Sequence, residues 1–202
     1  KSPRMSARPG AISIMTIENL WPLPSSFASM VSPARPDERK SAMQPGNNQL
    51  SMTVLMTPDM ANFSGNVHGG TLLKYLDEVA YACASRYAGR YVVTLSVDQV
   101  IFREPVHVGE LVTFLASVNY TGRTSMEIGV KVITENIREQ SVRHTNSCFF
   151  TMVALDDERK PVAVRPLELE TAEQKRRFAQ AQQRRQLRAE LEARYQAIRE
   201  DG

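Results

Sequence analysis

An asparagine, two glycines and an aspartate lie close together in the sequence, at Asn62, Gly69, Gly70 and Asp77. Hydrolysis of an ester or a thioester needs a base or nucleophile, together with donors aimed at the carbonyl oxygen as it becomes negative. A carboxylate can supply the first, and backbone N–H groups at the start of a helix can supply the second. Each residue also has an ordinary structural role. A Gly-Gly pair fits a tight turn, an asparagine often lies in a turn or caps a helix, and an aspartate often lies on the solvated face of a helix.

The segment 71–87 is the element that must position the carboxylate. Its apolar residues recur at helical spacing and cover a broad face, so a largely buried helix is predicted there, with Gly89 as its C-terminal stop. On a helical wheel Asp77 falls beside Leu73, Tyr81 and Ala84, at the margin of this apolar face. A weakly hydrated carboxylate suits either a general base or a nucleophile, and the sequence leaves these two roles open.

The rest of the ordered pattern consists of strands. One strand is predicted before the helix, followed by a loop that runs to about Gly69, and four more strands follow the helix without another helix between them. The predicted strands are 50–56, 91–103, 110–120, 123–137 and 143–155. In the fourth of these, Met126, Ile128, Val130 and Val132 alternate with Glu127, Gly129 and Lys131, which predicts one core face and one solvent face. This order indicates an α+β fold in which an antiparallel sheet curls around one helix.

The chain has 202 residues, 42% of them hydrophobic, and a net charge of +3. We expect a flexible, Pro- and Ser-rich extension over 1–45, one domain over 46–168, and a charged C-terminal helix over 169–202. The apolar residues of that last helix are thinly spread, so it is predicted to be solvated. The basic excess is concentrated between Lys175 and Arg188, so nucleic acid is not implied, although a basic surface would suit a polyphosphate ligand.

The two cysteines, Cys83 and Cys148, fall in an apolar helical run and a strand-like run, which predicts two buried, reduced thiols. Neither lies at a metal-ligand spacing, so no metal site is expected. No apolar run is long enough to span a bilayer, and no secretory signal is recognisable. We therefore expect a soluble, cytoplasmic protein.

The segment 62–77 reads Asn-Phe-Ser-Gly-Asn-Val-His-Gly-Gly and then Thr-Leu-Leu-Lys-Tyr-Leu-Asp. It resembles the hotdog-fold acyl-CoA thioesterases, in their bacterial and cytosolic branch. The similarity runs from about residue 50 to 167 and includes Val-Val-Thr-Leu-Ser-Val-Asp at 92–98 and Thr-Gly-Arg-Thr-Ser-Met at 121–126.

This resemblance implies that acyl-CoA is hydrolysed to a free acid and coenzyme A. Asp77 would be general base or nucleophile, and Asn62 with the Gly70 amide would polarise the thioester or orient water. The family forms hotdog dimers, in which each site takes its asparagine from one subunit and its aspartate from the other. Larger assemblies of such dimers are common, which is compatible with a hexamer built as a trimer of dimers. No cofactor is implied, since coenzyme A is part of the substrate.

The resemblance also places substrate contacts at His68 and Gly69, and near the coenzyme A nucleotide at Arg123, Thr124 and Ser125. Two alternatives remain open at this point. One is a hotdog enoyl-CoA hydratase or dehydratase, for which His68 would be the base. The other is a non-catalytic acyl-CoA sensor that acts through its terminal helix.

Overall fold

The computed structural model describes residues 48–102 and 104–200, so the predicted extension over 1–45 lies outside the described residues. The described elements are β1 (Gln49–Leu55), the 3-10 turn η2 (Pro58–Met60), α3 (Gly69–Ala88), β2 (Tyr91–Val97), β3 (Leu111–Thr121), β4 (Ser125–Asn136), β5 (Ser141–Leu155) and α4 (Ala172–Glu200). Within these residues, neither helix has the length and apolar composition needed to cross a membrane.

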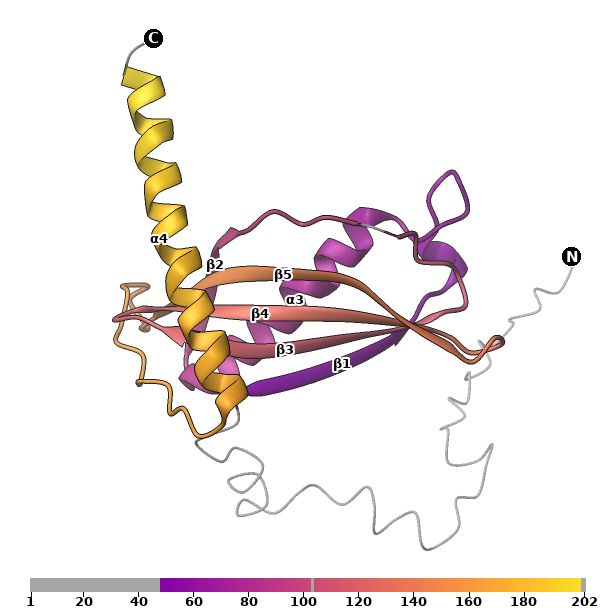
Figure 1. The fold of residues 1–202 in the computed structure, drawn as a ribbon, viewed down its shortest axis with the longest axis horizontal. Helices are drawn as coiled ribbons and strands as arrows, with labels where there is room; N and C mark the ends of the chain where they lie inside the picture. Colours follow the sequence, from indigo (N-terminus) through magenta and orange to yellow (C-terminus); the bar gives the residue numbers. More distant parts are fainter. Residues whose placement is uncertain (1–47, 103, 201–202) are drawn as a thin grey trace, which may run out of the picture. The chain divides into compact units, whose positions relative to one another are not determined.

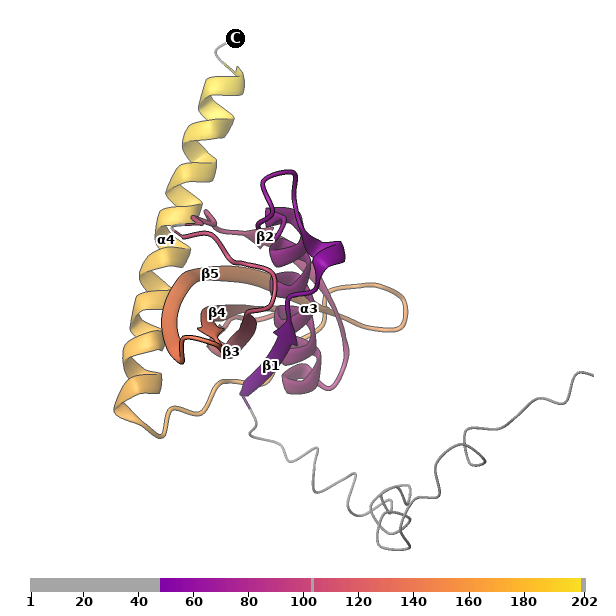
Figure 2. The same ribbon diagram turned by 90° about the vertical axis from the view of Figure 1, so that its right-hand side faces the viewer.

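The five strands form one antiparallel sheet in the order β1-β3-β4-β5-β2. The sheet curls, and α3 lies along one of its faces (Figures 1 and 2). The core lies between them, where Leu76 and Val79 of α3 and Phe114, Ile128 and Met152 of the sheet are almost fully buried. The predicted α+β architecture, a curled antiparallel sheet wrapped around one helix, is confirmed.

Helix α3 begins two residues earlier than predicted, because the two glycines form its first turn. N–H groups in a first turn have no partner within the helix, and here the side chain of His68 caps them by accepting from the Gly70 N–H. The helix ends as predicted, with Gly89 in the left-handed conformation at φ 62°. Both ends of the element that carries Asp77 are therefore set by residues next to it in the sequence.

Strand β2 is shorter than the prediction of 91–103, since it ends at Val97. A bulge at Leu95 shifts its register against β5, and Asp98 makes one further backbone hydrogen bond, from its N–H to the Phe149 carbonyl at 2.9 Å. Beyond that point the chain leaves the sheet, and no strand is assigned over 99–102. β2 is an edge strand, with β5 as its one neighbour in the sheet.

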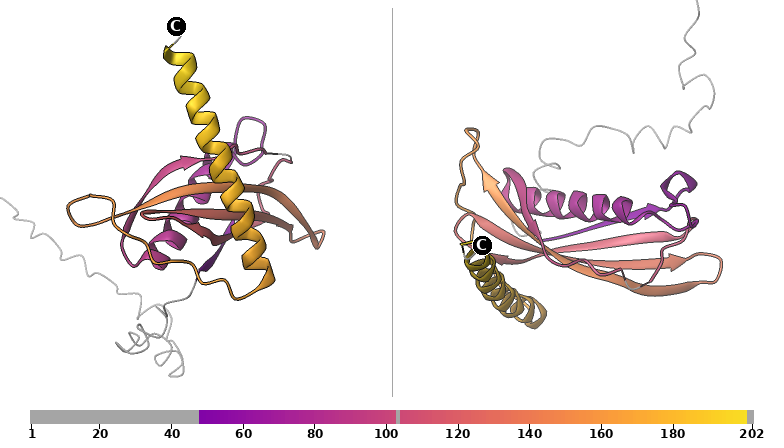
Figure 3. Two further views of the ribbon diagram at one scale, coloured as in Figure 1. Left: turned by 60° about the vertical axis from the view of Figure 1, so that its left-hand side comes forward. Right: turned by 90° about the horizontal axis from the view of Figure 1, so that it is seen from above.

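The prediction that the C-terminal helix is solvated is wrong for its first half. The first half of α4 packs on the outer face of the sheet, opposite α3 (Figure 3). Ala181 is fully buried, and the ring of Phe178 lies 5.1 Å from that of Tyr120 on β3. From residue 189 onward the helix is exposed along its length.

The first part of strand β4 is therefore covered on both faces. The predicted solvent face is wrong at Glu127 and Gly129, which are buried, and correct at Lys131, which is exposed. Glu127 is 2% exposed and accepts from Arg184 at 2.6 Å and from Arg188 at 2.8 Å. The long arginine side chains, rather than an apolar stripe, make much of the contact between α4 and the sheet. A buried carboxylate needs such partners, since an unpaired charge there would be costly.

Glu127→Gln should loosen α4 from the sheet, because Arg184 and Arg188 would then face a buried neutral amide. We expect the free energy of unfolding, measured in urea, to fall by roughly 2 kcal/mol. This is less than the loss expected for a fully buried ion pair, because both guanidinium groups are partly exposed. Amide exchange should also rise over 172–188. Glu190→Gln, at an exposed position of the same helix, is the matched control. Equal stability of the two variants would show that the ion pairs do not hold α4.

Candidate active site

Asp77 lies eight residues into α3, and its carboxylate has one specific partner on the sheet. The hydroxyl of Thr94, on edge strand β2, donates to Asp77 Oδ1 at 2.7 Å. A threonine hydroxyl has a single proton, so this bond orients one carboxylate oxygen and leaves Oδ2 to act on a water molecule or a substrate. The predicted neighbours Leu73 and Tyr81 are 39% and 40% exposed, so a single chain leaves this side of α3 open.

Thr94 was not predicted as a site residue, although a signal for it exists. Side chains alternate along a strand, so Thr94 shares a face with Val92, which is 1% exposed and belongs to the core. Thr94 itself is exposed, but this alternation turns it to the face of β2 that meets α3, where a carboxylate on the helix can accept from its hydroxyl.

Asn62 lies in the loop before α3 and organises that loop. Its Oδ1 accepts from the N–H groups of Ser64 at 2.9 Å and Asn66 at 3.1 Å. Its backbone N–H donates to the Asn66 carbonyl at 2.6 Å, while the Val67 N–H donates to the Val106 carbonyl at 2.8 Å. Because the amide oxygen is committed to the loop, the NH₂ group is the end of Asn62 that can serve a substrate.

The helix N-terminus is capped from within. His68 Nδ1 accepts from the Gly70 N–H at 2.9 Å, so in the neutral ring the proton is assigned to Nε2. The Gly70 amide, predicted to polarise the thioester, is therefore bonded to His68 in this structure. The roles predicted for Gly69 and Gly70 stay predictions, and a substrate oxygen would have to replace the imidazole nitrogen to reach the Gly70 N–H.

Alanine substitutions at Gly69 and Gly70 should show whether the hydrogen bond from the Gly70 N–H to His68 stabilises the helix. A Cβ on Gly70 would lie 2.9 Å from His68 Nδ1, whereas one on Gly69 would meet Phe102 at an ordinary 3.7 Å. Gly70→Ala should therefore displace the imidazole and cost about 1 kcal/mol of unfolding free energy, as for a lost helix cap. Gly69→Ala should cost less in the same thermal unfolding measurement, and the reverse order would contradict the cap.

Arg123, Thr124 and Ser125 form the turn between β3 and β4. Their backbone carbonyls accept from Val164, Ala154 and Gly122, respectively. The side chain of Arg123 is exposed, while Ser125 lines a cavity of about 470 Å³ on the outer face of the sheet. Two arginines of α4, Arg185 and Arg188, line the same cavity.

One chain does not bring the two halves of the predicted site together. Asn62 precedes the N-terminus of α3, whereas Asp77 lies about 12 Å along the helix axis from that end. Three apolar side chains of edge strand β2 are at least 46% exposed, namely Tyr91, Leu95 and Val97. The open face beside Asp77 is thus bordered by an unpaired strand edge and exposed apolar side chains.

Comparison with known proteins gives these residues a family context. Residues 64–141 match the thioesterase superfamily. Protein VdlD of Helicobacter pylori is 48% identical over 140 residues, which cover 69% of this chain and 80% of that protein. The acyl-CoA hydrolase of Staphylococcus aureus, solved with butyryl coenzyme A, coenzyme A and coenzyme A disulfide, matches with a TM-score of 0.70 at 30% identity, over 76% of this chain and 94% of that one. The chain belongs to the hotdog-fold acyl-CoA thioesterases.

Two further proteins of this family are similar to the chain. A hexameric acyl-CoA thioesterase solved in its apo form matches with a TM-score of 0.70 at 36% identity, over 73% of this chain and 94% of that one. The cytosolic acyl coenzyme A thioester hydrolase of Rattus norvegicus is 35% identical over 139 residues, which cover 68% of this chain but 36% of that protein.

The Staphylococcus aureus hydrolase has also been solved with an asparagine, an aspartate or a threonine replaced by alanine. In that protein the asparagine and aspartate are fifteen residues apart, and the aspartate and threonine seventeen. Asn62, Asp77 and Thr94 of this thioesterase have the same two separations. In the part of this chain that the structure describes, no three His, Cys, Asp or Glu side chains gather closely enough to hold a metal ion.

The two cysteines are buried and free, as predicted. Burial raises the pKa of Cys83 and that of Cys148 to about 12, from an ordinary value of 9.0. Well below pH 9 both thiols are protonated whether the chain is folded or unfolded, so their ionisation favours neither state. Between pH 9 and 12 the unfolded chain releases protons that the folded chain retains, so stability should fall there.

Native enzyme should accordingly give almost no colour with a chromogenic thiol reagent at pH 8, because the thiolate is the reacting species. Two equivalents per chain should react after unfolding in guanidinium chloride. Rapid labelling of the native protein would contradict the burial of these thiols.

Proposed function

We propose that this thioesterase hydrolyses acyl-CoA to a free carboxylic acid and coenzyme A, with Asp77 as general base or nucleophile. The observation that carries the proposal is the Asp77 carboxylate, oriented by Thr94 at 2.7 Å and facing an open side of α3. The matching separations of asparagine, aspartate and threonine in the Staphylococcus aureus hydrolase support it.

As a base, Asp77 takes a proton from water while the water oxygen bonds to the thioester carbon. The carbonyl oxygen becomes negative, and the Asn62 NH₂ group and the Gly70 N–H are the donors proposed to stabilise it. When the intermediate collapses, the C–S bond breaks and the coenzyme A sulfur takes up the proton. These reaction steps need no cofactor beyond the coenzyme A that is part of the substrate.

As a nucleophile, an Asp77 carboxylate oxygen would instead attack the thioester carbon. The C–S bond breaks, coenzyme A leaves as a thiolate that takes a proton from water, and the acyl-aspartyl anhydride is then hydrolysed by water to the free acid and Asp77. Pre-steady-state kinetics with acyl-CoA in excess over active sites separate the two roles. A burst of thiol equal to the site concentration, ahead of free acid, indicates the anhydride, whereas equal rates of thiol and acid release favour the general base.

We also propose that each active site combines Asn62 of one chain with Asp77 of a second chain. The separation of about 12 Å along α3 supports this arrangement, because both residues must reach the same carbonyl. A dimer that joins β2 edge strands would pair the open sheet edge and cover the exposed apolar residues beside it. The hexameric relative supports a further assembly of such dimers.

Subunit mixing tests this arrangement directly. Asn62→Ala and Asp77→Ala chains, each inactive alone, are unfolded together and refolded as a mixture. Half of the dimers should then be mixed, and each mixed dimer has one intact site, so about a quarter of wild-type activity should return. If both residues served a site within one chain, no activity would return.

The contacts to the coenzyme A nucleotide remain part of the proposal. We propose that Arg123, Thr124 and Ser125 lie near its phosphates, with His68 and Gly69 near the thioester. A cytoplasmic location is proposed from the similarity to the cytosolic acyl coenzyme A thioester hydrolase of Rattus norvegicus.

The hydratase alternative is disfavoured by the His68 cap, because Nδ1 of that ring already accepts from the Gly70 N–H. Loss of crotonyl-CoA absorbance without thiol release would nevertheless support it. Tight acyl-CoA binding without turnover would support the sensor.

A further inference from the structure

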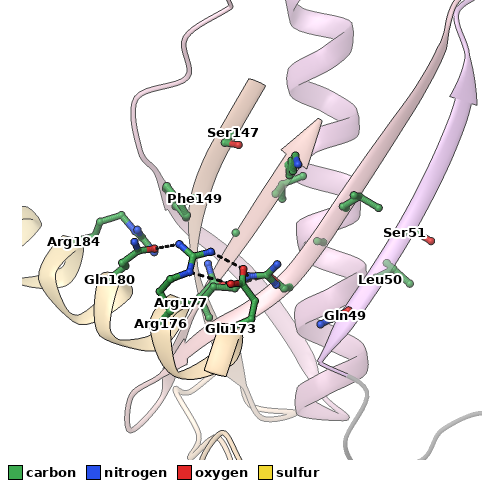
Figure 4. A pocket seen from close by; sticks show the side chains of 17 residues that line it. Gln49, Leu50, Ser51, Ser147, Phe149, Glu173, Arg176, Arg177, Gln180 and Arg184 are labelled. Atoms are coloured by element: carbon green, nitrogen blue, oxygen red, sulfur yellow. Dashed lines mark hydrogen bonds and ion pairs between the residues drawn. The ribbon is translucent and has the colours of Figure 1, made fainter. Parts of the chain in front are cut away.

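Asn62 is positioned by its own loop, whereas Asp77 has a partner on the sheet. A second cavity, under the first turns of α4, is lined by residues of β1, β3, β4, β5 and α4 and by none from 56–68 (Figure 4). That cavity therefore has no part in holding the Asn62 loop. The groups that do so belong to the loop itself and to residues 104–110, which precede β3.

The two loops are joined at the end of the sheet where α3 begins (Figure 1). Asn66 and His107 form an isolated antiparallel bridge, and the Val67 N–H donates to the Val106 carbonyl at 2.8 Å. The side chains of Val67 and Val106 are both buried. The loop that carries Asn62 is thus fixed to a segment that lies 41 positions later in the chain.

The imidazole of His107 adds a side-chain contact to this bridge. Its Nδ1 lies 2.9 Å from Oδ1 of Asn66. An amide oxygen can only accept, so the proton is assigned to Nδ1 and His107 is the donor. The neutral ring in this tautomer and the protonated ring both carry that proton, so the donor is present in either protonation state.

Asn66 transmits this constraint to Asn62 through two hydrogen bonds. The Asn66 N–H donates to Asn62 Oδ1 at 3.1 Å, and the Asn66 carbonyl accepts from the Asn62 N–H at 2.6 Å. Since a side-chain amide is planar, the bonds that fix Oδ1 also fix the direction in which the NH₂ group points. The orientation of this amide donor therefore depends on where Asn66 is held.

His107 is in turn anchored to the sheet by a buried carboxylate. Its backbone N–H donates to Glu110 Oε2 at 2.7 Å. Glu110 is 4% exposed and accepts from Nη2 of Arg143 at 2.7 and 2.9 Å. Arg143 lies on β5 and also donates to the Pro105 carbonyl at 2.9 Å. Charge-assisted hydrogen bonds of this kind are short and geometrically specific, so the backbone of His107 has a rigid support.

We propose that His107 is a positioning residue for thioester hydrolysis. Its imidazole holds Asn66, and Asn66 orients the Asn62 amide toward the thioester carbonyl, so His107 acts without contacting the substrate. This inference rests on the proposed function, in which the Asn62 NH₂ group stabilises the negative carbonyl oxygen. A histidine that only closed a turn would contribute to stability and leave the rate unchanged.

Three substitutions at His107 test this role in the full chain. His107→Asn places an amide NH₂ group close to the position of Nδ1, whereas the longer His107→Gln places it near that of Nε2, out of reach of Asn66. His107→Ala and His107→Gln should lower kcat for thiol release about fivefold, the size expected for one neutral hydrogen bond, with KM little changed. His107→Asn should stay within about twofold of the wild-type rate. His144→Ala, at an exposed histidine whose ring contacts only β5, is the matched control and should leave the rate unchanged.

A double-mutant cycle tests the route through Asn62. If His107 acts through Asn62, then adding His107→Ala to Asn62→Ala should lower the rate no further. An equal loss in both backgrounds would overturn the proposal. A wild-type rate in His107→Ala, or failure of His107→Asn to restore the rate, would also overturn it.

Amide exchange separates failure of this inference from failure of the proposed function. Exchange of the Ser64 and Asn66 N–H groups should rise in His107→Ala and His107→Gln and keep its wild-type rate in His107→Asn. Unchanged exchange in His107→Ala would show that the imidazole does not hold the loop. A wild-type rate of thiol release in Asn62→Ala would instead contradict the proposed function, and His107 would then be a loop anchor with no part in the reaction.

Discussion

Asp77→Ala should lower the rate of thiol release from acyl-CoA by about 10²–10⁴-fold, the usual contribution of a positioned acid–base group. The carboxylate is held by Thr94 at 2.7 Å, so its position is set before substrate binds. Loss of the side chain removes the group that would activate water or attack the thioester. Initial rates with a chromogenic thiol reagent measure the effect.

Two matched variants separate the chemistry of Asp77 from its position. Asp77→Asn can still accept from Thr94 but has no basic oxygen, so it should be nearly as inactive as Asp77→Ala. Thr94→Val keeps the carboxylate and removes its partner, so we expect a smaller loss of about tenfold, mainly in kcat. Full activity of purified, folded Asp77→Ala would exclude it from the chemistry and leave the fold assignment intact.

Asn62→Ala should lower the same rate by about 10²–10³-fold, the magnitude found when one oxyanion donor is lost. This variant alone is ambiguous, since Asn62 Oδ1 also accepts from the N–H groups of Ser64 and Asn66. Alanine therefore removes both the loop contact and the proposed donor. Amide exchange at Ser64 and Asn66 should rise in this variant.

Asn62→Asp resolves that ambiguity, because a carboxylate keeps the acceptor for the loop and replaces the NH₂ donors with an oxygen. We expect wild-type protection of the Ser64 and Asn66 amides, together with a rate as low as that of Asn62→Ala. If Asn62→Asp retained the wild-type rate, the amide donors would have no part in the reaction and the residue would be a loop anchor.

Much of the architecture could be predicted from sequence because its signals are local. Apolar spacing and Gly89 placed α3 within two residues of its observed start and one of its observed end. Alternation and turn residues predict the strands but not the end of β2, because the residues after Val97 still look strand-like although the chain leaves the sheet beyond Asp98. Asn62 and Asp77 were singled out through the family motif, and their catalytic roles remain predictions.

The sequence by itself determined the curled sheet, the buried helix and the residue types available for chemistry. The periodicity of apolar residues, the helix caps and the turn residues all depend on residues that are close together in the sequence. The tertiary structure alone decided that Thr94 holds Asp77 and that Arg184 reaches Glu127 across 57 residues of sequence. The contact between Arg184 and Glu127 could not be predicted, because α4 lacks the apolar stripe that usually indicates packing on a sheet. The aliphatic parts of its arginine side chains cover the sheet instead, and their charged ends pair with a buried acid. Such pairings depend on which surfaces meet after folding, and no local pattern records them.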